Sequence, residues 1–181
     1  MSLSVVSHPL PDYLRPGLKL VFVGINPGIK SAETGHHYAG PGNVFWPLLH
    51  ESGLVSERLT YEQDARVLEW GIGLTNMVQR ASRSVSDLSR DELRVGAQEL
   101  RRKLERYTPR VVCFNGKAIY DVFAGRSAKF GRQPERIGEA VVYVMPSTSA
   151  RTAAYQRADK LRFFEELRDL VHKGAGEQEV A

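Results

Sequence analysis

The sequence predicts an α/β fold with three layers, in which helices cover both faces of a mostly parallel central sheet. Four short runs rich in β-branched and aromatic residues, 19–23, 72–76, 110–114 and 140–145, have the length and composition of buried strands. Segments with helical patterns alternate with these runs. Such alternation requires crossover connections, which place neighbouring strands parallel and send helices to both faces of the sheet.

The N-terminal third of the chain is expected to carry the first strand and two helices. The strand at 19–23 ends at a glycine, and a loop rich in glycine and proline is expected from there to Asn43. Residues 45–51 predict a short helix that Gly53 ends. A capping box (Thr-Tyr-Glu-Gln) then begins a helix over 60–70, which leads to the second strand.

Three further helices are expected in the remainder of the chain. The first begins at a second capping box, Ser89 with Glu92, and runs to about Tyr107. Its apolar residues recur at helical spacing on one face: Leu93, Ala97, Leu100, Leu104 and Tyr107. Another helix is expected from Lys117, and the last from near Thr152. The last helix is expected to bury Leu161, Phe164, Leu167 and Leu170.

Composition predicts one domain and excludes several kinds of site. The 181 residues, 42% of them hydrophobic, suffice for one core over 17–172, flanked by an N-terminal extension, 1–16, and a polar tail, 173–181. A single cysteine, Cys113, excludes an internal disulfide and all-cysteine metal sites, and fits a reducing, intracellular compartment. The net charge of +4 is compatible with a polyanionic partner. We find no export signal and no run long enough to cross a membrane.

Candidate binding segments follow each predicted strand, at the edge of the sheet where α/β folds bind ligands. They are 24–28 (Gly-Ile-Asn-Pro-Gly), 75–76 (Thr-Asn), 115–117 (Asn-Gly-Lys) and 145–147 (Met-Pro-Ser). The glycines of 24–28 allow the backbone to approach a ligand, although an ordinary strand-exit turn is the simpler explanation. Segment 115–117 does not complete a phosphate-binding P-loop, because Val111 stands where the leading glycine should be.

Two other segments have both a functional and a structural interpretation. In 36–38 (His-His-Tyr), no third ligand at a recognisable spacing supports a metal site. The tyrosine can stack on a planar base or fold over the core. Segment 145–151 (Met-Pro-Ser-Thr-Ser-Ala-Arg) can contact phosphate or base edges, and it can equally cap the last helix.

Five segments taken in order carry a resemblance that each alone does not. They are 24–28, 35–46, 74–78, 114–120 and 143–151. Together they resemble the mismatch-specific uracil-DNA and thymine-DNA glycosylase family over about Gly17 to Leu170. The resemblance implies a uracil-DNA glycosylase-like α/β/α fold with no cofactor and no metal. Several segments are closer to the thymine-glycosylase branch, but the absence of that branch's long tails favours a compact bacterial enzyme.

The resemblance also implies roles for residues of the first three segments. Asn26 matches the asparagine that positions the attacking water. Tyr38 matches the aromatic that stacks on the flipped pyrimidine, with main-chain amides near Ile25 and Tyr38 reading its carbonyl groups. His37 and Asn76 match residues that line the base pocket.

DNA contacts are implied for the last two segments, and a catalytic hydroxyl for the loop after the second strand. Ser82 falls where the thymine branch has a water-holding hydroxyl residue. Segment 145–151 matches the loop that fills the gap in the base stack, with Arg151 as the wedge and Ser149 where some members have a bulky apolar plug. The expected DNA-contacting residues are Gly116, Lys117, Ser147, Thr148, Ser149, Ala150 and Arg151.

The chemistry of Asn26 predicts a slow enzyme that favours good leaving groups. An amide oxygen orients a water but does not take its proton as a carboxylate does. General-base catalysis normally contributes about 10²–10⁴-fold, and such a site lacks it. Asp87 follows Ser82 in the same loop and is a candidate compensating acid, or simply an exposed acid near a helix N-terminus.

The expected activity is that of a monofunctional glycosylase in base excision repair. Its partner is double-stranded DNA with a G:U or G:T mismatch, bound by a monomer in the bacterial cytoplasm or, in a eukaryote, the nucleus. Downstream abasic-site repair enzymes would follow it. A non-catalytic mismatch-binding protein is the first alternative, and the second is a nucleotide- or sugar-phosphate-binding α/β protein whose phosphate site is 115–117.

Overall fold

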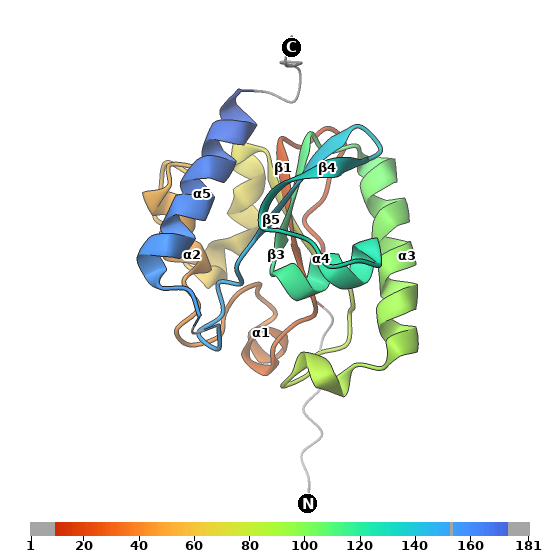
Figure 1. The fold of residues 1–181 in the computed structure, drawn as a ribbon. Coiled ribbons are helices and arrows are strands. Elements are labelled where there is room, and N and C mark those ends of the chain that lie inside the picture. Colours follow the sequence, from red (N-terminus) through yellow and green to blue (C-terminus); the bar gives the residue numbers. More distant parts are fainter. Residues whose placement is uncertain (1–9, 153, 174–181) are drawn as a thin grey trace, which may run out of the picture.

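The computed structural model describes residues 10–152 and 154–173, and these form the expected three-layer fold around a mostly parallel sheet. Five strands lie in the order β2-β1-β3-β5-β4 (Figure 1). The strands are β1 (Leu20–Gly24), β2 (Ile72–Asn76), β3 (Val111–Asn115), β4 (Gly131–Ile137) and β5 (Ala140–Met145). The pairs β1–β2, β1–β3 and β3–β5 are parallel, which confirms the predicted fold class.

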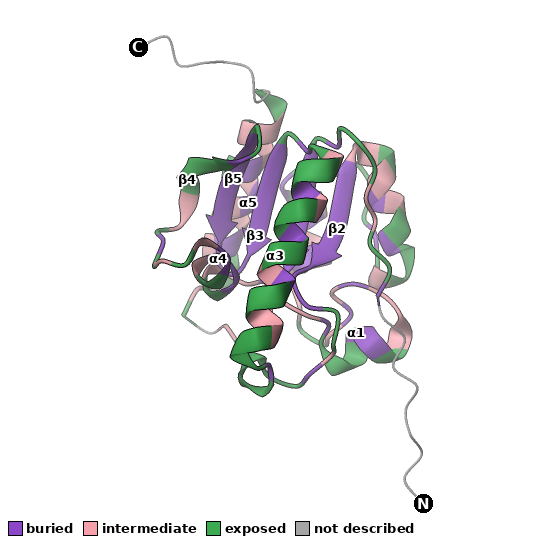
Figure 2. Ribbon diagram, turned by 90° about the vertical axis from the view of Figure 1, so that its right-hand side faces the viewer, coloured by how far each residue is buried: buried purple, intermediate pink, exposed green. Residues whose placement is uncertain are grey.

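Helices cover both faces of this sheet. They are α1 (Ile29–Thr34), α2 (Phe45–Glu51), η1 (Tyr61–Trp70), η2 (Val85–Asp87), α3 (Arg90–Tyr107), α4 (Lys117–Ala124) and α5 (Arg157–His172). α2, η1 and α5 pack on one face, and α3 and α4 on the other (Figure 1). Figure 2 shows α3 with an exposed outer side crossing the buried strands. Within residues 10–152 and 154–173, no helix has the length and apolar character needed to cross a membrane.

Strands β1, β2, β3 and β5 are mostly hydrophobic because both of their sides are buried. In β1, Leu20 and Phe22 face the α2–α5 core, whereas Val21 and Val23 face the α3–α4 core. This is the pattern of a parallel sheet covered on both faces. It explains why the four apolar runs predict strands within one residue of their observed bounds.

The capping boxes are confirmed, but the helix over 60–70 has a different geometry. The Ser89 hydroxyl accepts from the Glu92 amide at 3.1 Å, and the Glu92 carboxylate accepts from the Ser89 amide at 2.8 Å. The amide of Thr60 likewise donates to the Gln63 side chain at 3.1 Å. The segment that follows is a 3₁₀-helix with non-helical backbone at Gln63. The helix expected over 60–70 is therefore present, as a 3₁₀-helix.

Three further details differ from the sequence expectations. The six-residue α1 lies inside the segment expected to be a loop. The last helix begins at Arg157 and not near Thr152, because the amide of Gln156 donates to Asp159 and caps the helix there. Strand β4, which the sequence did not indicate, pairs antiparallel with β5 at the edge of the sheet.

The N-terminal segment from Leu10 packs along β2. Tyr13 forms an antiparallel bridge with Leu74, and the Thr75 hydroxyl donates to the Asp12 carboxylate at 2.7 Å. The second half of the expected extension, 1–16, is thus part of the folded structure. Residues 1–9 and most of the expected tail, 174–181, lie outside the described residues.

Candidate functional site

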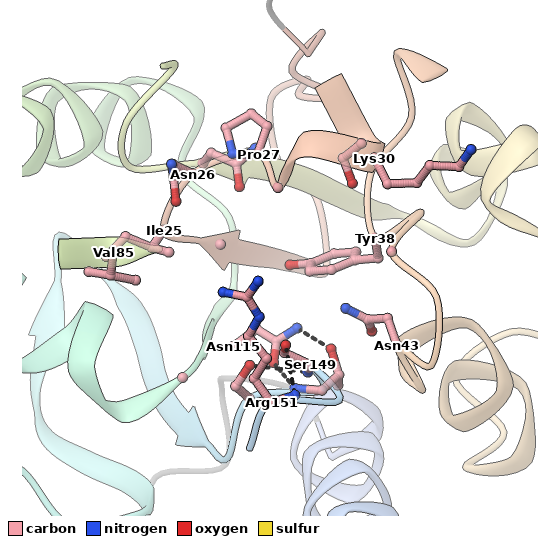
Figure 3. A pocket seen from close by; sticks show the side chains of 18 of the residues that line it. Ile25, Asn26, Pro27, Lys30, Tyr38, Asn43, Val85, Asn115, Ser149 and Arg151 are labelled. Carbon is pink, nitrogen blue, oxygen red and sulfur yellow. Dashed lines mark hydrogen bonds between the residues drawn. The ribbon is translucent and has the colours of Figure 1, made fainter. Parts of the chain in front are cut away.

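A cavity of about 860 Å³ lies at the carboxyl edge of the sheet, where the four candidate segments meet. It is lined by residues that follow β1, β2, β3 and β5, together with α1 and the loop after His36. Figure 3 shows Asn26 and Tyr38 on one side of this space and Asn115, Ser149 and Arg151 on the other. The structure thus brings together, around one cavity, segments far apart in the sequence.

The side-chain amide of Asn26 has one orientation because its nitrogen has two acceptors. Nδ2 donates to the carbonyl of Arg80 and to Ser82 Oγ, both at 2.8 Å. The Ser82 hydroxyl donates its own proton to the carbonyl of Ser84 at 2.7 Å, so it meets Asn26 as an acceptor. The opposite orientation would place Oδ1 against a carbonyl oxygen. Asn26 therefore directs Oδ1 away from this loop and toward the cavity (Figure 3).

Tyr38 and Asn76 lie close together at the end of β1. The Tyr38 ring stacks on Phe45 with centroids 4.0 Å apart and also lines the cavity. Asn76 is 8% exposed, and within the described part of the chain its side chain has no hydrogen-bond partner. A Cβ added to Gly24 would lie 2.4 Å from Asn76 Oδ1, so glycine at this position makes room for the amide. Burial raises the pKa of Tyr38, which keeps its hydroxyl protonated.

His37 lines the cavity as a neutral side chain. It is 2% exposed, and its Nε2 lies 2.7 Å from the Pro11 carbonyl, which only accepts. Nε2 therefore carries the proton. Burial lowers the pKa of His37, so in the neutral ring Nδ1 is unprotonated and is an acceptor.

The cavity holds basic side chains and no acid. Among the described residues that line it, none is aspartate or glutamate, and the charged ones are Lys30, Arg83 and Arg151. Asp87 is exposed in η2, does not line the cavity, and accepts from the Ser84 amide at 3.1 Å. Asp87 therefore does not line the cavity with Asn26 and Ser82, and its position is that of an exposed acid near a helix N-terminus, its alternative interpretation.

Most of the expected DNA-contacting residues also line the cavity. These are Gly116, Ser147, Thr148, Ser149, Ala150 and Arg151. Lys117 does not: its Nζ lies 2.6 Å from the Asp121 carboxylate and 3.1 Å from Ser127 Oγ. Its charge is thus paired with Asp121 on α4.

Among the interactions that hold the loop after β5 in place, two that the sequence did not indicate lie at the cavity. Asn115 and Thr148 form a buried reciprocal pair, with bonds of 2.9 and 3.0 Å, that ties the loop to the end of β3. The guanidinium of Arg151 donates to the carbonyl of Arg83, which links the loops after β5 and β2 at the cavity. For the Asn115–Thr148 pair, the position of Asn115 at a strand end was a signal in the sequence. Its partner, Thr148, depends on tertiary contacts.

The side chains of the described residues also show whether they are grouped as a metal site requires. They contain no group of three or more histidine, cysteine, aspartate or glutamate side chains that could hold a metal ion. The polar groups in the cavity are amides, hydroxyls, a neutral imidazole and cations. Such a set can donate hydrogen bonds to the oxygens of a planar ligand and orient a water through Asn26.

Comparison with known proteins identifies the family of this chain. The model of the uracil DNA glycosylase superfamily matches residues 11–170. The chain belongs to this superfamily. The match begins at Pro11, which agrees with the packing of the N-terminal segment on β2. Superfamily membership supports glycosylase activity on DNA as the general class of function.

A solved structure agrees with this at the level of the fold. The chain is similar to a candidate uracil DNA glycosylase from Methanosarcina acetivorans, determined by solution NMR, with a TM-score of 0.61 and 20% identity. The similarity covers 90% of this chain and 98% of that one. The superfamily fold therefore accounts for nearly the whole described structure.

Proposed function

We propose that this protein is a monofunctional, mismatch-specific glycosylase that flips uracil paired with guanine out of duplex DNA and hydrolyses its N-glycosidic bond. Thymine and modified pyrimidines are further candidate substrates. The observation that carries the proposal is the single orientation of Asn26, whose carbonyl oxygen is directed to an acid-free cavity. Such an amide holds a water in line with a sugar carbon without a metal.

The proposed reaction needs stabilisation of charge more than proton abstraction. The bond between the sugar C1′ and the base nitrogen breaks, and the base keeps the electron pair. The water held by Asn26 adds to C1′ and loses one proton to solvent water, and the released base anion takes up a proton from solvent. Hydrogen-bond donors directed at the uracil oxygens stabilise the anion, and we assign this role to Asn76 and to main-chain amides near Ile25 and Tyr38. DNA phosphates stabilise the positive charge on the sugar.

Selectivity for mispaired uracil follows from the weakness of this catalysis. Without a general base, a site gives up about 10²–10⁴-fold in rate and depends on a good leaving group, so uracil is expected to react faster than thymine. Extrusion of a base costs a few kcal/mol, and least for a mispaired one. We therefore expect U·G pairs to be better substrates than U·A pairs.

Arg151 is the proposed wedge that occupies the gap left by the flipped base. In the free protein its guanidinium donates to the Arg83 carbonyl at the cavity. Insertion into the stack would exchange this contact for contacts with the orphaned guanine. The protein would act as a monomer, and its product, DNA with an abasic site, would be the substrate of the next repair enzyme.

The test is single-turnover cleavage of a labelled duplex with one U·G pair, in chelator, by the wild type and Asn26→Ala. We expect uracil release by the wild type and a loss of at least about 100-fold in the variant, since misplacing a reactant costs that much. Duplexes with U·A and T·G pairs measure selectivity. Tight U·G binding without base release would favour a mismatch-binding protein, for which the acid-free cavity is the supporting observation. If the wild type neither bound the U·G duplex nor released uracil, both functions would be excluded.

A further inference from the structure

Asp64 is a buried carboxylate behind the cavity that the proposed reaction does not use. Its side chain is 1% exposed, and it belongs to η1. It accepts from Tyr13 Oη and His36 Nδ1, both at 3.0 Å, and from the amide of His37 at 2.9 Å. Three segments therefore meet at this one carboxylate: the N-terminal segment, η1 itself, and the loop that follows α1.

These contacts fix the peptide that precedes Tyr38. The ring of His37 donates to the Pro11 carbonyl at 2.7 Å. The main-chain carbonyl of His37 accepts from Trp46 Nε1 at 3.1 Å. With Asp64 on its amide, the residue is held through its amide, its ring and its carbonyl. The side chain of His36 is bound to the same carboxylate.

Tyr38 needs such support because its backbone is strained. Its φ is +53°, in the left-handed region that residues other than glycine seldom adopt. Strained residues at functional sites persist where the surrounding structure over-determines them. Here Phe45 stacks on the ring of Tyr38, and Asp64 holds the two residues before it.

We propose that Asp64 is a positioning residue that keeps Tyr38 and the neighbouring main chain in the conformation that receives the flipped base. This inference rests on the proposed function for its effect on rate, but the contacts themselves can be tested without it. A carboxylate suits the position because its two oxygens accept from three donors. An amide at the same place presents only one acceptor oxygen.

The functional test compares Asp64→Ala, Asp64→Asn and Tyr13→Phe with the wild type. We expect Asp64→Ala to lower the single-turnover rate on U·G DNA by about tenfold or more. Its affinity for a duplex with an abasic site, which places no base in the pocket, should change by less than about twofold. Asp64→Asn keeps the shape and one acceptor, so it should lie between, and Tyr13→Phe removes one donor of three and should have the smallest effect. Glu62→Gln, an exposed carboxylate on the same η1, is the matched control and should behave as the wild type.

The structural test is hydrogen exchange measured by NMR in the free protein. Asp64→Ala should speed exchange of the Trp46 indole proton and the His37 amide. The indole of Trp70, which donates to Ser56, is the internal reference and should not change. If Asp64→Ala does not fold, the same comparison in Asp64→Asn decides.

The two tests separate the possible outcomes. Unchanged exchange overturns the inference, whether or not the rate falls, because Asp64 would then not hold the loop. Faster exchange with an unchanged rate overturns the link to base binding. If the wild type releases no base from any duplex, the proposed function fails, and exchange still decides whether Asp64 holds the loop.

Discussion

Ser82→Ala tests whether the orientation of Asn26 controls the rate. The hydroxyl accepts from Asn26 Nδ2 at 2.8 Å and passes its own proton to the Ser84 carbonyl at 2.7 Å. The substitution removes one of two acceptors from Asn26, while the Arg80 carbonyl, also at 2.8 Å, remains. One net hydrogen bond contributes about 0.5–1.5 kcal/mol, so the single-turnover rate should fall by about two- to tenfold.

The assay is single-turnover cleavage of U·G duplex, with Ser82→Thr as the control that keeps the hydroxyl and should retain most of the rate. Two results would refute the reasoning. If Ser82→Ala were as slow as Asn26→Ala, Ser82 would itself take part in the reaction and not only orient the amide. If its rate equalled that of the wild type, the hydrogen bond would have no part in placing Asn26.

Two further perturbations address the cavity wall. Gly24→Ala places a methyl group 2.4 Å from Asn76 Oδ1 and should displace that amide. For one lost hydrogen bond, the cleavage rate should fall by about two- to tenfold, and an unchanged rate would show that Asn76 does not read the base. Burial lowers the pKa of His37, so as pH falls below about 6.5 the unfolded chain binds a proton that the folded protein excludes, and stability decreases. Between pH 7.5 and pH 5.5, Tm should therefore fall less for His37→Gln than for the wild type. An equal fall in Tm for the two proteins would contradict a buried, neutral His37.

Much of the fold could be predicted because its strands are buried on both sides and its helices have local signals. Residues 111–115 show an uninterrupted apolar run before Asn115, and the Ser89–Glu92 capping box marks the start of α3. Strand β4 carries no such signal, since most of its residues are exposed and Pro134 interrupts it. Proline is tolerated there because the strand lies at the sheet edge.

The candidate site was predictable in its location but not in its internal geometry. Asn76 ends β2, and Asn26 and the loop after Met145 follow β1 and β5; the parallel order of these strands brings all three to one edge of the sheet. Asp87 lies five residues after Ser82 but does not line the cavity, and its carboxylate accepts from the Ser84 amide in η2. Lys117 also does not line the cavity, and Asp121, one helical turn later, pairs its charge.

The sequence by itself determined the fold class, the order along the chain of the four strands β1, β2, β3 and β5, and the set of polar residues at their carboxyl ends. These follow from local hydrophobic pattern and turn chemistry, which depend on neighbouring residues. The tertiary structure alone decided which way the Asn26 amide points, which acids stay outside the cavity, and how Tyr13, His36 and His37 share Asp64. Each of these depends on hydrogen bonds between residues far apart in the chain, and the direction of a hydrogen bond is settled only when both partners are in place.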